Sequence, residues 1–524
     1  MGIKRFYANK DNTISNALKS DLINSGSKSN MGASDILEVF SIFAQASTSS
    51  LEESRVLISF PIEEISASIA RGEIPTAAGS GRSDVKYFIK LFNAEHSNST
   101  PEKFFLDLRP VNTDHWGANV DPEHTEGWTE GQGLDMENYS DSGSSNWISA
   151  RSDQDWGSPG CNGITDTHAN LARPIYFERG DEDISIDMSA YIKLWLANIT
   201  GSASRRKYDG LLIRLSGAYA SGSARSYYTK KFFARGSQFF FKRPCIEAVW
   251  DSSKKDDRGT FFASSSLLSS EDNLHKLFLY NNFRGQPKNI PLGNGSNDIY
   301  VEVYPDVDGK PSGQRLTTLP STPITGGIFS DGRKDIKGIY TASLALNTTS
   351  SVVHDVWFSG STQFFTGTFN VKQLKGSDYS GADDKYVTSI RNLRPTYKFN
   401  DKPRIRLFTR KKDWCPTVYT VASKKAEVEI VEDVFYKVTR ISDNLEVIPY
   451  MTGSNKNFAT RVSYDASGSY FDLDMSLLEP DYAYELRFTF YLNGHYQEQR
   501  DKFKFRVEED RQNRIGEDMI GEPT

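Results

Sequence analysis

The residues of this 524-residue chain that could do chemistry are scattered, and one loop holds the best candidates for metal ligands. His115 and His124 lie there together with Asp114, Asp121 and Glu123. Imidazole and carboxylate groups suit zinc, but a site needs three or four of them converging on one point. The loop has neither HxH nor HxxxH spacing. We therefore favour a polar loop and predict no metal site.

A second acidic motif, Asp306-Val307-Asp308-Gly309, resembles the beginning of a calcium-binding loop. Such loops place carboxylates on alternate residues ahead of a glycine that makes a sharp turn. The rest of an EF-hand loop is missing, and no bidentate glutamate follows at the required offset. We therefore expect an ordinary type I turn between two strands at this motif.

Motifs for catalysis or cofactor binding are missing from the sequence. It contains no GxSxG nucleophile motif, no GxGxxG dinucleotide motif and no Walker A motif. Paired carboxylates are uninformative in a chain with 68 acidic residues. We predict that the protein is not an enzyme, with no catalytic residue and no cofactor.

Four tryptophans, Trp116, Trp128, Trp147 and Trp156, are the best candidates for binding residues. They lie in a long irregular region, roughly 109–174, and long loops in compact domains are often binding surfaces. Flat aromatic rings can stack on sugars or anchor a protein–protein interface. Trp128 and Trp147 fit the core of a sandwich better, whereas Trp116 and Trp156 are more open to an interface or glycan contact.

Charge and composition exclude several classes of partner. The net charge of −6 and the isoelectric point of about 5.8 argue against nucleic acid, whose binding needs basic patches. The basic clusters 205–207 and 410–412 are more typical of solvated loops. No apolar run approaches 18 residues, so we predict no membrane insertion. The N-terminus lacks a secretory signal, and three widely spaced cysteines indicate reduced thiols in a cytosol.

The distribution of strand-like segments predicts an all-β protein. Short alternating runs rich in aromatic and β-branched residues recur along the chain, separated by turn residues. Helical spacing is limited to 62–70 and a segment near 190–196. We predict an N-terminal jelly-roll-like β-sandwich with a Trp-rich insertion, followed by two smaller Ig-like β-sandwiches and a polar tail. Their predicted bounds are 1–258, 259–395, 396–510 and 511–524.

The first half of the chain carries short motifs in a characteristic order. They are the strands Val56–Phe60 and Tyr87–Phe92, then Trp128-Thr129-Glu130, Trp147, Ile186–Ser189 with Trp195, Gly210–Leu215, Phe233–Arg235 and Arg243–Trp250. In this order they resemble the disaggregatase-related (DNRLRE) β-sandwich family, with a longer insertion between Trp128 and Ile184. The resemblance implies a jelly-roll-like sandwich of the kind found in secreted and surface proteins, often beside carbohydrate-active modules, and no catalytic residue.

Three further segments carry a resemblance that extends over the whole chain. They are Tyr7–Ile14, Gly32–Ile42 and Arg461–Phe471. They resemble virion structural proteins of tailed phages, particularly marine phages. The resemblance implies a non-enzymatic subunit of the tail, neck or head, made in the host cytoplasm and located in the virion. Its partners would be other virion proteins and copies of itself. The alternative is a carbohydrate-binding surface or adhesion protein that grips a cell-surface glycan with the Trp-rich loop.

Overall fold

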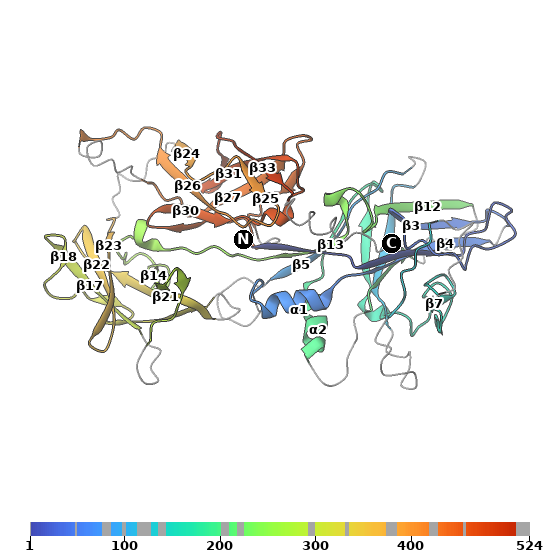
Figure 1. Ribbon diagram of the computed structural model, residues 1–524, viewed down its shortest axis with the longest axis horizontal. Coiled ribbons are helices and arrows are strands. Elements are labelled where there is room, and N and C mark those ends of the chain that lie inside the picture. The colour runs from blue at the N-terminus through green and yellow to red at the C-terminus, as the bar shows by residue number, and fades with distance from the viewer. Residues whose placement is uncertain are drawn as a thin grey trace, which may run out of the picture. The chain divides into compact units, whose positions relative to one another are not determined.

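The computed structural model forms two compact units, which we call the N-terminal unit (residues 4–74 and 85–248) and the C-terminal unit (mainly residues 249–524). Both units consist largely of β-sheet (Figure 1). The predicted all-β, multi-sandwich fold class is therefore confirmed. The structure describes residues 2–47, 50–75, 85–96, 101–112, 127–134, 143–200, 209–216, 225–291, 299–330, 335–373, 385–418, 428–453 and 457–509.

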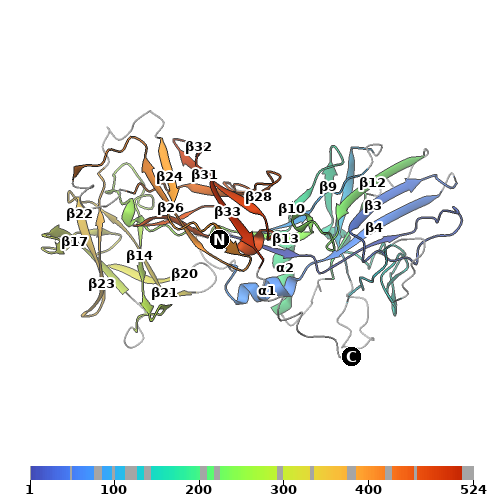
Figure 2. The same cartoon turned by 45° about the horizontal axis from the view of Figure 1, so that its top comes forward.

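The N-terminal unit contains two main sheets. The larger has the order β12-β3-β4-β11-β6-β9, with β2 also paired to β4, and the smaller has the order β1-β13-β5-β10. Figure 2 shows β12, β3 and β4 side by side. The strands are β1 (Ile3–Tyr7), β2 (Lys10–Ser15), β3 (Ile36–Phe43), β4 (Leu51–Ser59), β5 (Lys86–Leu91), β6 (Phe104–Pro110), β9 (Arg173–Phe177), β10 (Ile184–Asp187), β11 (Leu211–Leu215), β12 (Ser226–Phe233) and β13 (Cys245–Val249).

Strand β6 shows why these residues form a two-faced sheet. Phe104, Leu106 and Leu108 are buried, whereas Phe105 and the residues that alternate with it are more accessible. Successive side chains in a strand point to opposite faces. Apolar residues at every second position therefore lie on one face of the sheet, and this face packs into the core. The strands expected at Val56–Phe60 and Tyr87–Phe92 likewise overlap β4 and β5.

Two helices, α1 (Ile62–Ala70) and α2 (Ser189–Thr200), pack against each other within the N-terminal unit. Helix α1 buries Ile62 and Ile65 on one face and carries two glutamates in its first turn, where the positive end of the helix dipole favours negative charge. Both helices lie where helical spacing predicted them. No helix among the described residues is long and apolar enough to cross a membrane.

The first sandwich of the C-terminal unit is built around a core that includes Tyr340 and Trp357. Its main sheet has the order β14-β21-β20-β17-β22-β23, with two short strands, β18 and β19, attached to β17 and β21. The strands are β14 (His275–Tyr280), β15 (Asn282–Phe283), β16 (Gln286–Pro287), β17 (Ile299–Val307), β18 (Lys310–Pro311), β19 (Thr318–Leu319), β20 (Ile324–Ser330), β21 (Asp335–Leu346), β22 (Val352–Ser359) and β23 (Thr362–Asn370).

The segment 256–264 lies against both outer strands of this sheet. Asp257 accepts the backbone N–H of Lys276 at the start of β14, at 2.7 Å. Phe261 O accepts the N–H of Lys372, just beyond β23, at 2.8 Å. Arg258 makes ion pairs with Asp256 and with the fully buried Asp355 of β22. The segment therefore links β14 to β23 and shields edges that would otherwise offer unpaired backbone groups.

The turn at Asp308-Gly309 differs from the predicted type I turn. Both residues have positive φ angles, 55° and 75°, and the flanking Val307 and Lys310 face each other across the hairpin. This is a type I′ geometry, whose twist matches that of two-residue hairpins. Asp306 contacts the Nε2 atom of His354 at 2.6 Å. The motif is thus a tight hairpin with a neighbouring aspartate–histidine contact.

The last sandwich has two sheets, β24-β26-β30-β29 and β25-β33-β31-β27-β28, with β32 paired to β31. Strand β24 pairs with β26, so this sandwich begins before the predicted boundary at 395. The predicted tail 511–524 lies outside the described residues. The strands are β24 (Tyr386–Ile390), β25 (Thr396–Lys398), β26 (Arg404–Lys411), β27 (Val434–Arg440), β28 (Glu446–Ile448), β29 (Ser463–Asp465), β30 (Gly468–Asp472), β31 (Ala483–Leu492), β32 (His495–Glu498) and β33 (Phe503–Glu508).

Candidate functional site

Part of the Trp-rich region forms a second, smaller core with the larger sheet of the N-terminal unit. Leu57 of β4 and Leu212 of β11 face each other in the sheet and contribute to this core. The residues that complete the cluster are Ile14, Val111, Trp128, Trp147, Ala150, Trp156 and Cys161. The described part of the region is therefore a packed layer, because apolar groups removed from water stabilise it.

The three described tryptophans are enclosed in this layer. Trp128, Trp147 and Trp156 are only 2%, 8% and 5% exposed. Trp128 Nε1 donates to the carbonyl of Asp209 at 2.8 Å, and Trp156 Nε1 donates to the carbonyl of Asn146 at 2.9 Å. Their polar atoms are thus satisfied inside the protein, as buried indoles require.

These positions settle the expectations for three of the four tryptophans. The preference for a core position is confirmed for Trp128 and Trp147. The expectation that Trp156 faces a glycan or a partner protein is wrong, because its ring is covered. Trp116 lies outside the described residues, so its role stays a prediction.

Arg55 and Asp166 hold the loop of this layer together. The Arg55 guanidinium lies 4.8 Å from the Trp147 ring and donates to the carbonyl of Gly160 at 2.5 Å. The buried Asp166 carboxylate accepts backbone N–H groups from three loop residues, among them Gly163 at 2.6 Å. Burial, with Asp166 nearby, raises the pKa of the Cys161 thiol, so this cysteine is an inert part of the core.

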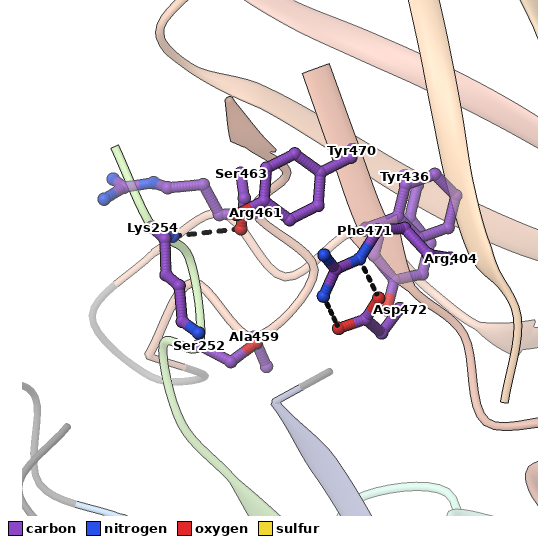
Figure 3. Close-up of a pocket in the computed structure, with 10 residues that line it drawn as sticks. All are labelled: Ser252, Lys254, Arg404, Tyr436, Ala459, Arg461, Ser463, Tyr470, Phe471 and Asp472. Atoms are coloured by element: carbon purple, nitrogen blue, oxygen red, sulfur yellow. Dashed lines mark hydrogen bonds and ion pairs between the residues drawn. The ribbon is translucent and has the colours of Figure 1, made fainter. Parts of the chain in front are cut away.

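A pocket in the C-terminal unit is the second candidate site. Its walls come from the segment after Trp250, from strands β26 and β27 and from the stretch 459–472 (Figure 3). Arg404 pairs with Asp472 through two contacts of 2.8 and 3.1 Å, and Tyr436 and Phe471 stack with ring centroids 4.4 Å apart. The lining residues are Ser252, Lys254, Arg404, Tyr436, Ala459, Arg461, Ser463, Tyr470, Phe471 and Asp472.

Cationic side chains outnumber carboxylates among the residues that line this pocket. Three cationic side chains line it, against one carboxylate, Asp472. Although burial opposes its ionisation, Arg404 holds the pKa of Asp472 below its usual value. Burial, reinforced by the charge of Asp472, raises the pKa of Tyr436, so its hydroxyl stays neutral. Arg461 in turn pairs with Asp251 at 3.2 Å and with Asp433 at 3.4 Å, so the charges of both arginines are compensated within the protein.

The side chains that line this pocket are mostly charged groups and hydrogen-bonding groups. No imidazole or thiol lines it, and the Ser463 hydroxyl accepts the backbone N–H of Lys254 at 2.9 Å. Within the described ranges, no group of three or more His, Cys, Asp or Glu residues could hold a metal ion.

The residues of this pocket carry no recognisable motif in the sequence. Lys254, Arg404 and Asp472 are far apart in the chain and meet only because β26 pairs with β30 and the 251–255 segment crosses nearby. The available signal was weak, because a lone charged residue at a strand end is usually a solvated surface group.

Exposed aromatic groups form a third kind of feature. Phe105 and Tyr176 are paired across β6 and β9, with ring centroids 4.9 Å apart. Tyr491 and Tyr496 form a similar pair in the β31–β32 hairpin, at 4.8 Å. Phe283 lies in the β15–β16 hairpin. Exposed tyrosine and phenylalanine side chains are enriched at interfaces, so these are candidate contact points.

Comparisons with known proteins identify no family. No protein-family model and no curated protein matches the chain. Among solved structures, it is similar to Salmonella alpha-2-macroglobulin reacted with methylamine, with 8% identity and a TM-score of 0.14 over 97% of this chain and 34% of that chain. It is also similar to the FN1–FN3 domains of chicken CNTN1, with 9% identity and a TM-score of 0.14 over 81% of this chain and 97% of that one. The chain spans about a third of the alpha-2-macroglobulin. Scores this low carry no argument about function.

Proposed function

We propose that this chain is a non-enzymatic structural subunit of a tailed-phage virion, located on the tail, neck or head and working through protein–protein contacts in a symmetric assembly. The observation that carries the proposal is the set of exposed aromatic side chains on strands and hairpins, such as Phe105, Tyr176 and Phe283. Such rings anchor interfaces when a neighbour covers them. The proposed location on a virion is based on the segments that resemble virion structural proteins.

The architecture supports this function on physical grounds. β-Sandwiches are stiff modules that present loops and hairpins at fixed positions. Several contacts of modest strength, repeated in an ordered assembly, add up because each bound contact raises the effective concentration for the next. A subunit of this kind needs no catalytic pocket.

The deciding test is whether the protein occurs at a fixed copy number in an ordered particle. We expect cryo-EM of purified particles to show it in a ring or shell, and quantitative mass spectrometry to give a constant ratio to the other components. Variable copy number, or a chain that is always free, contradicts the proposal.

The second candidate, a carbohydrate-binding adhesion protein, now depends on Trp116 alone, because the other three tryptophans of the loop are buried. A glycan array with wild type and Trp116→Ala tests it. Binding that disappears in Trp116→Ala would favour the adhesion protein. Equal signals for wild type and Trp116→Ala would mean that the Trp-rich loop does not bind the sugar.

A further inference from the structure

The β15–β16 hairpin is an exposed finger built around one aromatic residue. Its two-residue turn, Arg284-Gly285, has φ angles of 52° and 76°, which give a type I′ hairpin that twists with its strands. Every residue from Asn282 to Asn289 is exposed, and Phe283 is 52% exposed. A large ring on a tight hairpin is already ordered, so binding through it costs little conformational entropy.

Two cations flank this ring. The guanidinium of Arg284 lies 5.1 Å and the ammonium of Lys288 4.8 Å from the ring centroid of Phe283. The segment 281–291 contains no acidic residue, so the finger carries two positive charges in a chain whose net charge is −6. An aromatic ring beside arginine and lysine fits an apolar surface rimmed by carboxylates.

A surface of that description is present on the same chain, in the N-terminal unit. Phe105 and Tyr176 are 40% and 51% exposed and form a pair at one edge of the larger sheet. The stretch Glu178–Asp183 follows directly and holds four acidic residues and one arginine. Glu178 itself is exposed, two residues beyond Tyr176. The patch therefore complements the finger in two ways: its apolar rings match the Phe283 ring, and its excess negative charge matches the two cations.

We propose that the Phe283 finger of one copy docks on the Phe105–Tyr176 patch of a second copy. The inference rests on the proposed structural function, and it identifies a second copy of this chain as the partner in one contact of the assembly. Finger and patch are different surfaces, so the contact is heterologous. Repeated, it produces a closed ring or an open chain of copies, in contrast to a two-fold dimer, which pairs identical surfaces.

Sedimentation velocity of the full chain over a broad concentration range tests the contact. We expect wild type to form species larger than dimers, and added salt to weaken them because part of the attraction is electrostatic. Phe283→Ala should weaken the association about thirtyfold, the effect of losing a hot-spot ring. Leu267→Ala removes another exposed side chain of the same sandwich and should leave association unchanged.

A charge-exchange experiment is the second test of the contact. Arg284→Glu should weaken association, and Glu178→Arg added to it should restore much of the loss, since the double variant again pairs opposite charges. A wild type that stays monomeric, or a Phe283→Ala variant that associates normally, overturns the contact. Fixed copy number in particles with Phe283→Ala leaves the structural function standing while refuting the finger, so the two failures are distinguishable.

Discussion

Asp11 offers the sharpest test of the electrostatics of the N-terminal unit. It is 1% exposed and accepts the backbone N–H of Arg235 at 2.6 Å, while Glu130 accepts the N–H of Asp11 at 2.7 Å. Burial raises the pKa of Asp11 from 3.8 to about 7, the charge of Glu130 adds to the rise, and Arg235 opposes it. The folded protein therefore keeps this carboxyl protonated in mildly acidic solution.

The change Asp11→Asn removes this titration while keeping the size of the side chain. A pKa raised in the folded state contributes stability that is present below pH 3.8 and is lost as pH rises through 7. A rise of about three pH units corresponds to about 4 kcal/mol in the free energy of unfolding, since each unit is worth about 1.4 kcal/mol. We expect Asp11→Asn to be more stable than wild type at pH 8, by up to about 4 kcal/mol.

The assay is denaturant unfolding across a series of pH values, with hydrogen exchange in β2 and β4 reporting on the N-terminal unit. Between pH 4 and 7, wild type should lose about 1.4 kcal/mol per pH unit relative to the variant. Asp21→Asn, on an exposed turn, should not change this slope. Parallel curves, or a variant less stable at pH 8, would refute the reasoning and show that Asp11 is ionised and stabilised by Arg235.

Three further changes test other parts of the structure. Arg258→Met should destabilise the C-terminal unit by about 3–5 kcal/mol in denaturant unfolding, because it leaves the buried Asp355 carboxylate without its cation. Trp128→Ala should cost about 3–5 kcal/mol in the N-terminal unit, measured by loss of exchange protection, since it opens a cavity and removes the indole N–H that donates to the carbonyl of Asp209. Although burial opposes ionisation, neighbouring cations lower the pKa of Glu247 from 4.5 to about 2. Its stabilisation is present above pH 4.5 and lost as pH falls toward 2, so Glu247→Gln should flatten acid unfolding followed by circular dichroism.

Each of these changes has a contradicting result. A stable Arg258→Met variant would show that the segment 256–264 is held by its backbone contacts alone. Trp128→Ala with unchanged protection would mean that the Trp-rich layer does not support the sheet. Acid unfolding of Glu247→Gln with the same slope as wild type would mean that the cations around this carboxylate contribute no net stability.

Local patterns in the sequence were sufficient for the elements themselves. The strand expected at Tyr87–Phe92 and the helical spacing of 62–70 identified a strand and a helix close to the observed bounds. Both depend on residues a few positions apart, which the backbone geometry of a strand or helix places on one face. The overall all-β fold follows from many such segments. The preference for core positions at Trp128 and Trp147 was likewise correct.

Long-range packing decided the rest. Trp156 reads as an open loop residue in sequence, but the larger sheet presents Leu57 and Leu212 beneath its layer, so the ring is buried. The pocket that contains Lys254 and Arg404 brings together residues that are distant in the chain. The contacts of the segment 256–264 with β14 and β23 do the same. The local periodicity of a sequence does not indicate such long-range contacts. Types and spacing along the chain determine how each segment folds, whereas strand pairing across the sheets determines which side chains meet and which remain exposed.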